Sequence, residues 1–103
     1  MSQSLDDDRA KHCSVLRKHL DNIENTKSKI DKIIIVCDLF QYLNNNIDFV
    51  KSHEKFKKCV ATKINQFRKE ISEGGINDIL INNDNRYYID KMNYLFDKIE
   101  SKI

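Results

Sequence analysis

The chain of 103 residues contains no proline and no tryptophan, and its two glycines are adjacent, Gly74 and Gly75. Proline and glycine interrupt helices more strongly than other residues, so almost nothing breaks a helix before that pair. The apolar residues recur mostly at intervals of three and four, which is the spacing of a helix face. The sequence therefore predicts an all-α fold.

No apolar run approaches the length of a membrane span. The first eight residues are polar and acidic, unlike the start of a secretory or mitochondrial targeting segment, so we expect a soluble intracellular protein. Cysteine is also scarce. Cys13, Cys37 and Cys59 are odd in number, far apart, and each within an apolar helical pattern, which predicts buried free thiols in a reducing compartment.

Positive and negative charges nearly balance. The chain has 18 Lys and Arg residues and 16 Asp and Glu residues, which give a formal net charge of +2. Such a balance gives weak attraction to acidic partners and falls short of a dedicated nucleic-acid binder. Apolar residues make up 40% of the chain, enough for one core. We expect a single domain over residues 1–103, with its core over about 5–101.

The predicted architecture is a compact right-handed bundle of four main helices in two hairpins, with one or two short helical turns. Ser4 with Asp7, and Ser28 with Asp31, are predicted N-terminal caps. The asparagine run 44–46 predicts a break, and Gly74-Gly75 a helix end. The expected helical segments are 5–22, 28–43, 47–51, a helix from about 52 to the glycines, and a last helix carrying Tyr88 to Ile99, with 76–81 short and 72–85 a longer loop.

The second helix has the widest apolar stripe and is expected to be central. The helix that begins near residue 52 has a narrower stripe and a basic remainder. The four tyrosines are expected at the edges of the core, with Tyr87 the candidate for exposure. The second-helix stripe contains Ile30, Ile33, Ile34, Cys37, Phe40 and Leu43, and the later stripe contains Phe56, Val60, Ile64, Phe67 and Ile71.

Two short segments place an apolar side chain beside polar or charged ones where a helix is expected to end. A helical domain can present a small groove to a peptide in this way, so these segments predict a partner-docking site. Ile23 and Phe67 also fit core positions by their spacing. The segments are Ile23-Glu24-Asn25 and Phe67-Arg68-Lys69.

Nothing in the sequence predicts catalysis, a metal or a cofactor. No nucleophile with a base and no paired carboxylates have supporting spacing, and Gly74-Gly75 lacks the lysine and hydroxyl of a phosphate-binding loop. His12 and His19 are about 10 Å apart along a helix and cannot share one metal ion without distortion. We therefore expect a non-enzymatic protein.

Four stretches, in their order and spacing, resemble a known family over roughly Asp7 to Ile99. The chain resembles the integrase-binding domain of the lens-epithelium-derived growth factor and hepatoma-derived growth factor relatives, a variety of the transcription elongation factor S-II amino-terminal helical domain. The four stretches are Asp8-Arg9 followed by Leu20 and Ile23-Glu24-Asn25, then Asp38-Leu39-Phe40-Gln41-Tyr42-Leu43 running to His53, then Lys63-Ile64-Asn65-Gln66-Phe67-Arg68, and last Ile89-Asp90-Lys91 through Leu95-Phe96-Asp97-Lys98-Ile99.

The resemblance implies a nuclear adaptor that binds short disordered motifs of chromatin and transcription proteins, often an acidic residue near Phe-x-Gly-Phe, in a groove between two helical hairpins. Retroviral integrase, which uses the same surface in the family, is a further implied partner. By position, Ile23 would line the pocket, Glu24 would replace an aspartate that accepts backbone hydrogen bonds, and Phe67 would cover the pocket. Lys18 and Lys63 match basic positions that meet acidic partner residues.

The sequence departs from the family where Lys69 replaces a valine. Two alternatives stay open beside the expected monomeric adaptor. One is a self-associating helical protein, in which dimerisation would cover the stripe from Ile30 to Leu43. The other is a weak nucleic-acid binder, ranked last because its basic helix lacks interleaved aromatic residues. That helix would use Lys55, Lys57, Lys58, Lys63, Arg68 and Lys69.

Overall fold

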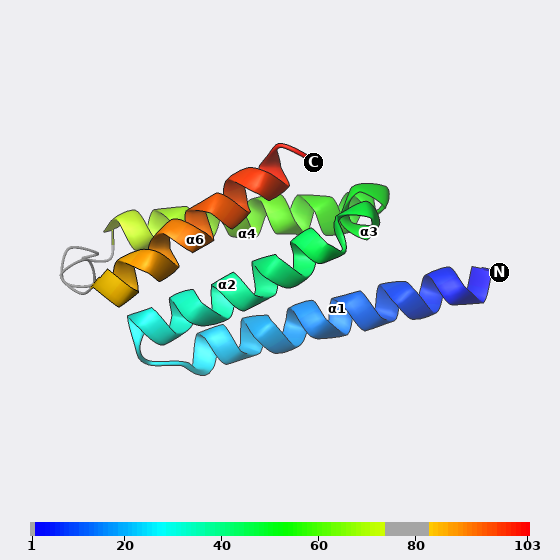
Figure 1. Ribbon diagram of the computed structural model, residues 1–103. Coiled ribbons are helices and arrows are strands. Elements are labelled where there is room, and N and C mark those ends of the chain that lie inside the picture. The colour runs from blue at the N-terminus through cyan, green and yellow to red at the C-terminus, as the bar shows by residue number, and fades with distance from the viewer. Residues whose placement is uncertain (1, 74–82) are drawn as a thin grey trace.

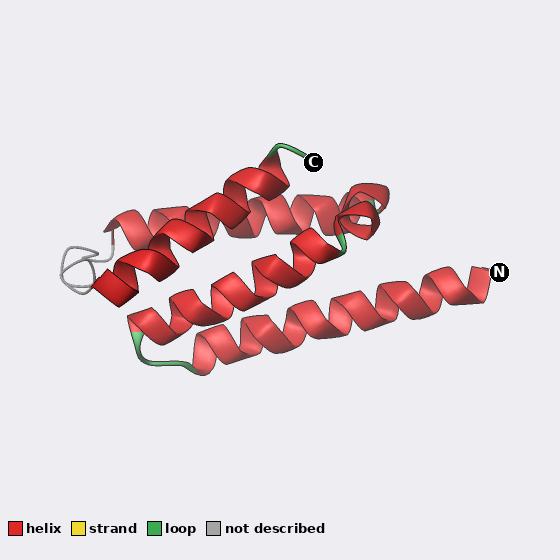
Figure 2. Ribbon diagram, viewed as in Figure 1, coloured by secondary structure: helices red, strands yellow, loops and turns green. Residues whose placement is uncertain are grey.

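The computed structural model describes residues 2–73 and 83–103, which form helices joined by short loops and contain no strand (Figure 2). The all-α prediction is confirmed, and so is the prediction of four main helices with a short additional one. The helices are α1 (Ser2–Asn25), α2 (Lys29–Asn45), α3 (Ile47–Ser52), α4 (Glu54–Glu73) and α6 (Asn83–Glu100).

Helices α1 and α2 run antiparallel to each other, and α6 runs back across α4 at an angle (Figure 1). The most extensive contact between helices joins α2 to α6, and α2 also packs against α1 and α3. Helix α2 is therefore central, as its wide apolar stripe predicted. Since α1 has 24 residues and α2 has 17, the N-terminal part of α1 extends past the end of α2 (Figure 1).

The α2 stripe is covered within the chain itself. Phe40 is fully buried, and its ring meets the Phe96 ring edge to face, with centroids 4.7 Å apart. Contacts from the same chain therefore bury most of the surface through which self-association was expected. The buried apolar residues of α2 are Ile33, Val36, Cys37, Leu39, Phe40 and Leu43.

Several helix ends differ from the prediction. Helix α1 begins at Ser2 and continues to Asn25, so Ser4 lies inside the helix and the prediction that it caps the N-terminus is wrong. Nothing in the sequence stops α1 at Asn22, because no glycine or proline follows it before α2. The Ser28 cap is confirmed, since its side chain accepts a hydrogen bond from the Asp31 backbone N–H.

The predicted break at the asparagine run is confirmed, and it falls at the last of the three asparagines. Asn44 is buried inside α2, where its side-chain amide donates to the backbone carbonyls of Phe40, at 2.9 Å, and Leu95, at 3.4 Å. The turn falls at Asn46, and the short helix that follows is α3. A contact with α6 thus keeps Asn44 helical although asparagine favours helix ends.

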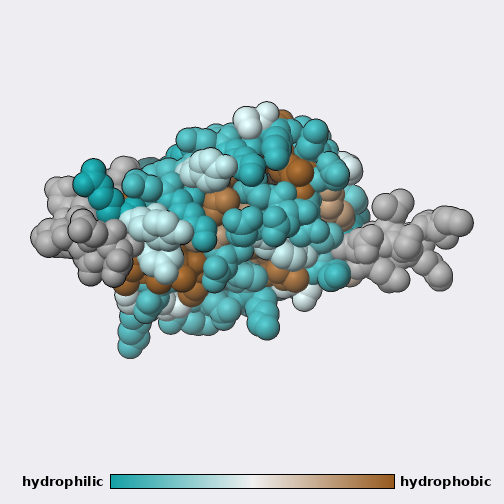
Figure 3. All heavy atoms as spheres, viewed as in Figure 1, coloured by the Kyte–Doolittle hydropathy of each residue, from teal (hydrophilic) through white to brown (hydrophobic). Residues whose placement is uncertain are grey.

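The long loop predicted over 72–85 is wrong at both margins, because α4 continues to Glu73 and α6 starts at Asn83. The predictions for Gly74-Gly75 and for residues 76–81 lie outside the described residues. In the described part of the chain, no helix is long and apolar enough to cross a membrane. The face seen in Figure 3 is mainly hydrophilic, with hydrophobic residues in small separate areas.

Candidate functional site

An open groove of about 580 Å³ lies between α1 and the start of α4. Its floor contains Leu16 and Phe56, which are nearly buried, together with three half-buried apolar side chains. We call this feature the α1–α4 groove. The described residues that line it are Arg9, Cys13, Leu16, Arg17, Leu20, Ser52, His53, Glu54, Lys55, Phe56 and Cys59.

The groove exists because His12 fixes α1 against α2 and α3. The His12 ring is buried, its Nδ1 lies 2.5 Å from the Tyr42 hydroxyl, and its centroid lies 4.1 Å from that of Phe49. Burial also raises the pKa of the Tyr42 phenol. His12 and Leu16 point into the core. Cys13 and Leu20 therefore lie at the edge of the contact that α1 makes with α2 and α3, and they are only half-buried.

The opposite wall follows from the register of α4. Phe56 and Val60 point into the core. Lys55 and Cys59 each precede one of these residues, so they lie at the edge of the core and line the groove. His53 precedes α4 and is held by Phe49, whose carbonyl lies 3.0 Å from its Nδ1 and whose ring stacks on it with centroids 4.1 Å apart. The apolar floor is therefore continuous between two helices.

The rim of the groove is cationic. Arg9, Arg17 and Lys55 are all exposed, and none of them forms an ion pair with another described residue. The acid among the lining residues is Glu54, whose carboxylate lies 3.7 Å from the Lys57 ammonium group. The groove can therefore attract a negatively charged ligand while its floor contacts apolar side chains.

His12 and His53 both lie against the Phe49 ring, but no cluster of three or more His, Cys, Asp or Glu side chains within residues 9–71 and 86–103 could hold a metal ion. All three cysteines are free, but only Cys37 is buried. Its thiol donates to the Tyr88 carbonyl at 3.3 Å. Burial raises the pKa of Cys37 to about 11. The prediction of burial is wrong for Cys13 and Cys59, which line the groove.

The first predicted segment does not form a turn. Ile23, Glu24 and Asn25 are the last residues of α1, and Ile23 is only 7% exposed and belongs to the core. Glu24 and Asn25 are exposed at the end of the bundle where the α1–α2 loop lies (Figure 1). Glu24 therefore remains accessible to a partner, whereas Ile23 supports the helix from inside.

The second predicted segment lies within α4, which continues to Glu73 instead of ending at Lys69. Phe67 is 5% exposed and its ring meets the Phe40 ring edge to face, with centroids 6.3 Å apart. The prediction that Phe67 is an exposed cover for a pocket is therefore wrong. Helical continuity puts this residue on the buried stripe of α4.

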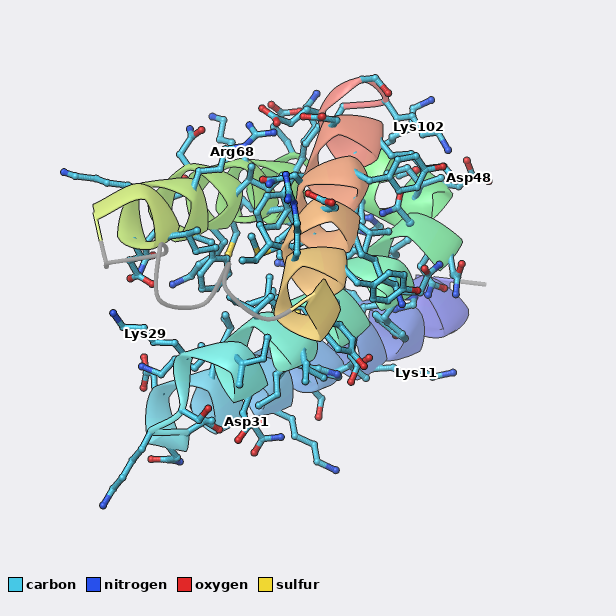
Figure 4. All side chains as sticks on the ribbon, turned by 60° about the vertical axis from the view of Figure 1, so that its left-hand side comes forward. Lys11, Lys29, Asp31, Asp48, Arg68 and Lys102 are labelled. Carbon is cyan, nitrogen blue, oxygen red and sulfur yellow. The ribbon has the colours of Figure 1, made fainter. Side chains whose placement is uncertain are left out.

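Arg68 is used within the fold. Its guanidinium bonds the Asp97 carboxylate at 2.6 Å and the Glu100 carboxylate, and it lies over the Phe96 ring, 5.6 Å from the centroid. Figure 4 shows Arg68 on α4 beside α6. These contacts join α4 to α6, so Arg68 is poorly available to an acidic partner.

The remaining predicted residues are spread over two helices. Lys63 is half-buried and donates to the Gln66 side chain at 3.3 Å, and Lys69 is exposed on α4. Lys18 borders a second depression along α1, which shares Cys13 and Arg17 with the groove. None of the eight predicted site residues lines the α1–α4 groove itself. The sequence signal for it was Arg9 and Arg17 beside the apolar stripe of α1.

The molecule is a small all-α bundle with an apolar groove and a cationic rim. No family model, curated protein or solved structure that was compared with the chain matches it.

Proposed function

We propose that the chain is a non-enzymatic protein-interaction domain that binds a short acidic segment with an apolar anchor in the α1–α4 groove. The observation that carries the proposal is the combination of an apolar floor with exposed Arg9, Arg17 and Lys55, which lack ion-pair partners among the described residues. The resemblance adds the partner class: disordered motifs of nuclear chromatin or transcription proteins, with retroviral integrase as a further candidate.

The dimensions of the groove suit a side chain of the partner better than a whole domain. Small-ligand sites range over roughly 300–1,000 Å³, and one phenylalanine with its neighbours fits within the observed volume of about 580 Å³. Aromatic anchors provide most of the affinity at such sites. A disordered segment loses conformational freedom when it binds, so we expect micromolar affinity.

The direct test is titration of a fluorescein-labelled peptide, Phe-x-Gly-Phe flanked by Asp and Glu, followed by fluorescence anisotropy. Lys55→Glu and Arg17→Glu should each weaken binding about three- to tenfold, the effect of losing and reversing one exposed charge pair. Lys58→Glu is the matched control, because Lys58 is exposed on the same helix but does not line the groove. Replacing both peptide phenylalanines with alanine should abolish saturable binding.

Equal weakening by Lys58→Glu and Lys55→Glu would mean that net charge alone attracts the peptide, and the proposed groove would be wrong. Glu24→Ala distinguishes binding in the α1–α4 groove from binding at the end of the bundle where the α1–α2 loop lies. Glu24 lies at that end and not in the groove. Loss of binding in Glu24→Ala alone would move the site to that end, as the resemblance implies. Absence of binding by the wild-type protein would refute this ligand class.

A further inference from the structure

The exposed side of α6 carries two tyrosines, and these are the large hydrophobic residues most exposed in the described structure. Tyr87 is 61% exposed and Tyr94 is 60% exposed. The prediction that the tyrosines lie at core edges is therefore wrong for Tyr94. Each tyrosine combines a large apolar ring with a polar hydroxyl group, so two exposed rings on one helix offer aromatic contact area to a ligand.

Lysines alternate with these tyrosines along the helix. At 3.6 residues per turn, the four positions fall within an arc of about 60°, and the two tyrosines are separated by about 10 Å along the axis. The Lys98 ammonium group lies over the Tyr94 ring, 5.7 Å from its centroid. We call this set the α6 stripe, and its members are Tyr87, Lys91, Tyr94 and Lys98.

The carboxylates of α6 neutralise little of the positive charge of the α6 stripe. Arg68 of α4 binds both Asp97 and Glu100, so these carboxylates are already paired. Asp90 is exposed and borders the stripe, about 60° around the helix from Tyr87. Neither Lys91 nor Lys98 forms an ion pair with a described residue, and Lys102 adds a cation near the end of α6 (Figure 4).

We infer that the α6 stripe binds single-stranded nucleic acid, with the tyrosine rings stacking on bases and the lysines contacting phosphates. Single-strand binding surfaces combine aromatic platforms with positive charge in this way. A protein partner fits less well, because lysine is depleted from the centres of protein interfaces, whereas here a lysine follows each tyrosine. The aromatic residues of the basic helix α4 are buried, whereas those of α6 include the exposed Tyr87 and Tyr94.

The inference can be tested with fluorescein-labelled dT12 and rU12 at increasing salt concentration. Two phosphate contacts predict a slope of log affinity against log salt of about −1.4, and Lys98→Gln should reduce its magnitude by about 0.7. Tyr94→Ala should weaken binding about tenfold at constant salt, and Tyr94→Phe should retain it. The same variants should leave peptide binding in the α1–α4 groove unchanged, because no α6 residue lines the groove.

Lys58→Gln is the control for loss of one exposed positive charge away from the stripe, and circular dichroism checks that each variant is folded. Tighter binding of one oligonucleotide would identify DNA or RNA as the preferred source of the same chemistry. Equal binding by Tyr94→Ala and wild type would overturn the inference, as would equal affinity for the dT12–dA12 duplex, whose bases are already stacked. Loss of peptide binding together with oligonucleotide binding would place both ligands at one surface and also overturn it.

Discussion

Replacing Phe67 with alanine should mainly destabilise the fold, and this distinguishes the observed position of Phe67 from the one predicted by sequence. The ring is 5% exposed and meets Phe40 edge to face. Phenylalanine-to-alanine changes in cores cost about 3–5 kcal/mol, a large part of the roughly 5–15 kcal/mol that stabilises a typical domain. The midpoint of thermal unfolding should therefore fall by about 12 °C or more.

The assay is urea unfolding followed by far-ultraviolet circular dichroism, with Phe67→Leu as the matched variant. Leucine keeps the site apolar and fills much of its volume, so its cost should be about 1–2 kcal/mol. A loss below about 1 kcal/mol in Phe67→Ala, combined with abolished peptide binding, would refute the assignment of Phe67 to the core. That result would return it to the ligand-contacting role implied by the resemblance.

Three further predictions concern contacts inside the bundle. Arg68→Met should lower the free energy of unfolding by about 1 kcal/mol, because its carboxylate partners Asp97 and Glu100 are partly exposed, and the loss measured in urea should shrink at high salt. Burial raises the pKa of Cys37 from 9.0 to about 11, so the unfolded state loses its thiol proton first. The stability due to this shift is complete below pH 9 and falls as pH rises toward 11, at up to about 1.4 kcal/mol per unit, and Cys37→Ala should lack this fall in pH-dependent urea unfolding. Asn44→Asp should destabilise more than Asn44→Ala in the same assay, since a carboxylate would face the carbonyl oxygens that the Asn44 amide now contacts.

Each of these has a contradicting outcome. An Arg68→Met loss that does not change with salt would assign its contribution to packing on Phe96 instead of charge pairing. An equal pH dependence in wild type and Cys37→Ala would mean that another group controls alkaline stability. Equal stability of Asn44→Asp and Asn44→Ala would mean that the buried contact with α6 is not maintained in solution.

The elements of the fold could be predicted from local patterns, whereas the ends of the helices depended on tertiary contacts. The Ser28 cap and the short helix after Asn46 follow from neighbouring residues. Asn44 does not, because its helical state is supported by a bond to Leu95, 51 positions away in the chain. Helix α1 was predicted to end at Asn22 but ends at Asn25. The sequence at Asn22 contains no strong signal that would stop a helix.

The candidate site was less predictable, because periodicity identifies the apolar face of a helix but not how far a neighbour covers it. Cys13 and Leu16 belong to one stripe, yet Leu16 is nearly buried and Cys13 lies half-exposed in the groove. The difference arises from the contact of His12 with Tyr42 and Phe49, which sets the position of α1 against α2 and α3. No local pattern in the sequence specifies that contact.

The two proposed surfaces lie on different helices, and this arrangement constrains how they can be coupled. The α1–α4 groove uses α1 and the start of α4, whereas the stripe lies on α6, and Arg68 bonds α6 from a later turn of α4. Sites without shared residues usually act additively within about 0.3–0.5 kcal/mol. A double-mutant cycle of Lys55→Glu with Tyr94→Ala should therefore show no coupling in peptide binding. A coupling energy above that range would contradict independent surfaces. If Arg68→Met abolished this coupling, the contact between α4 and α6 would be what transmits it.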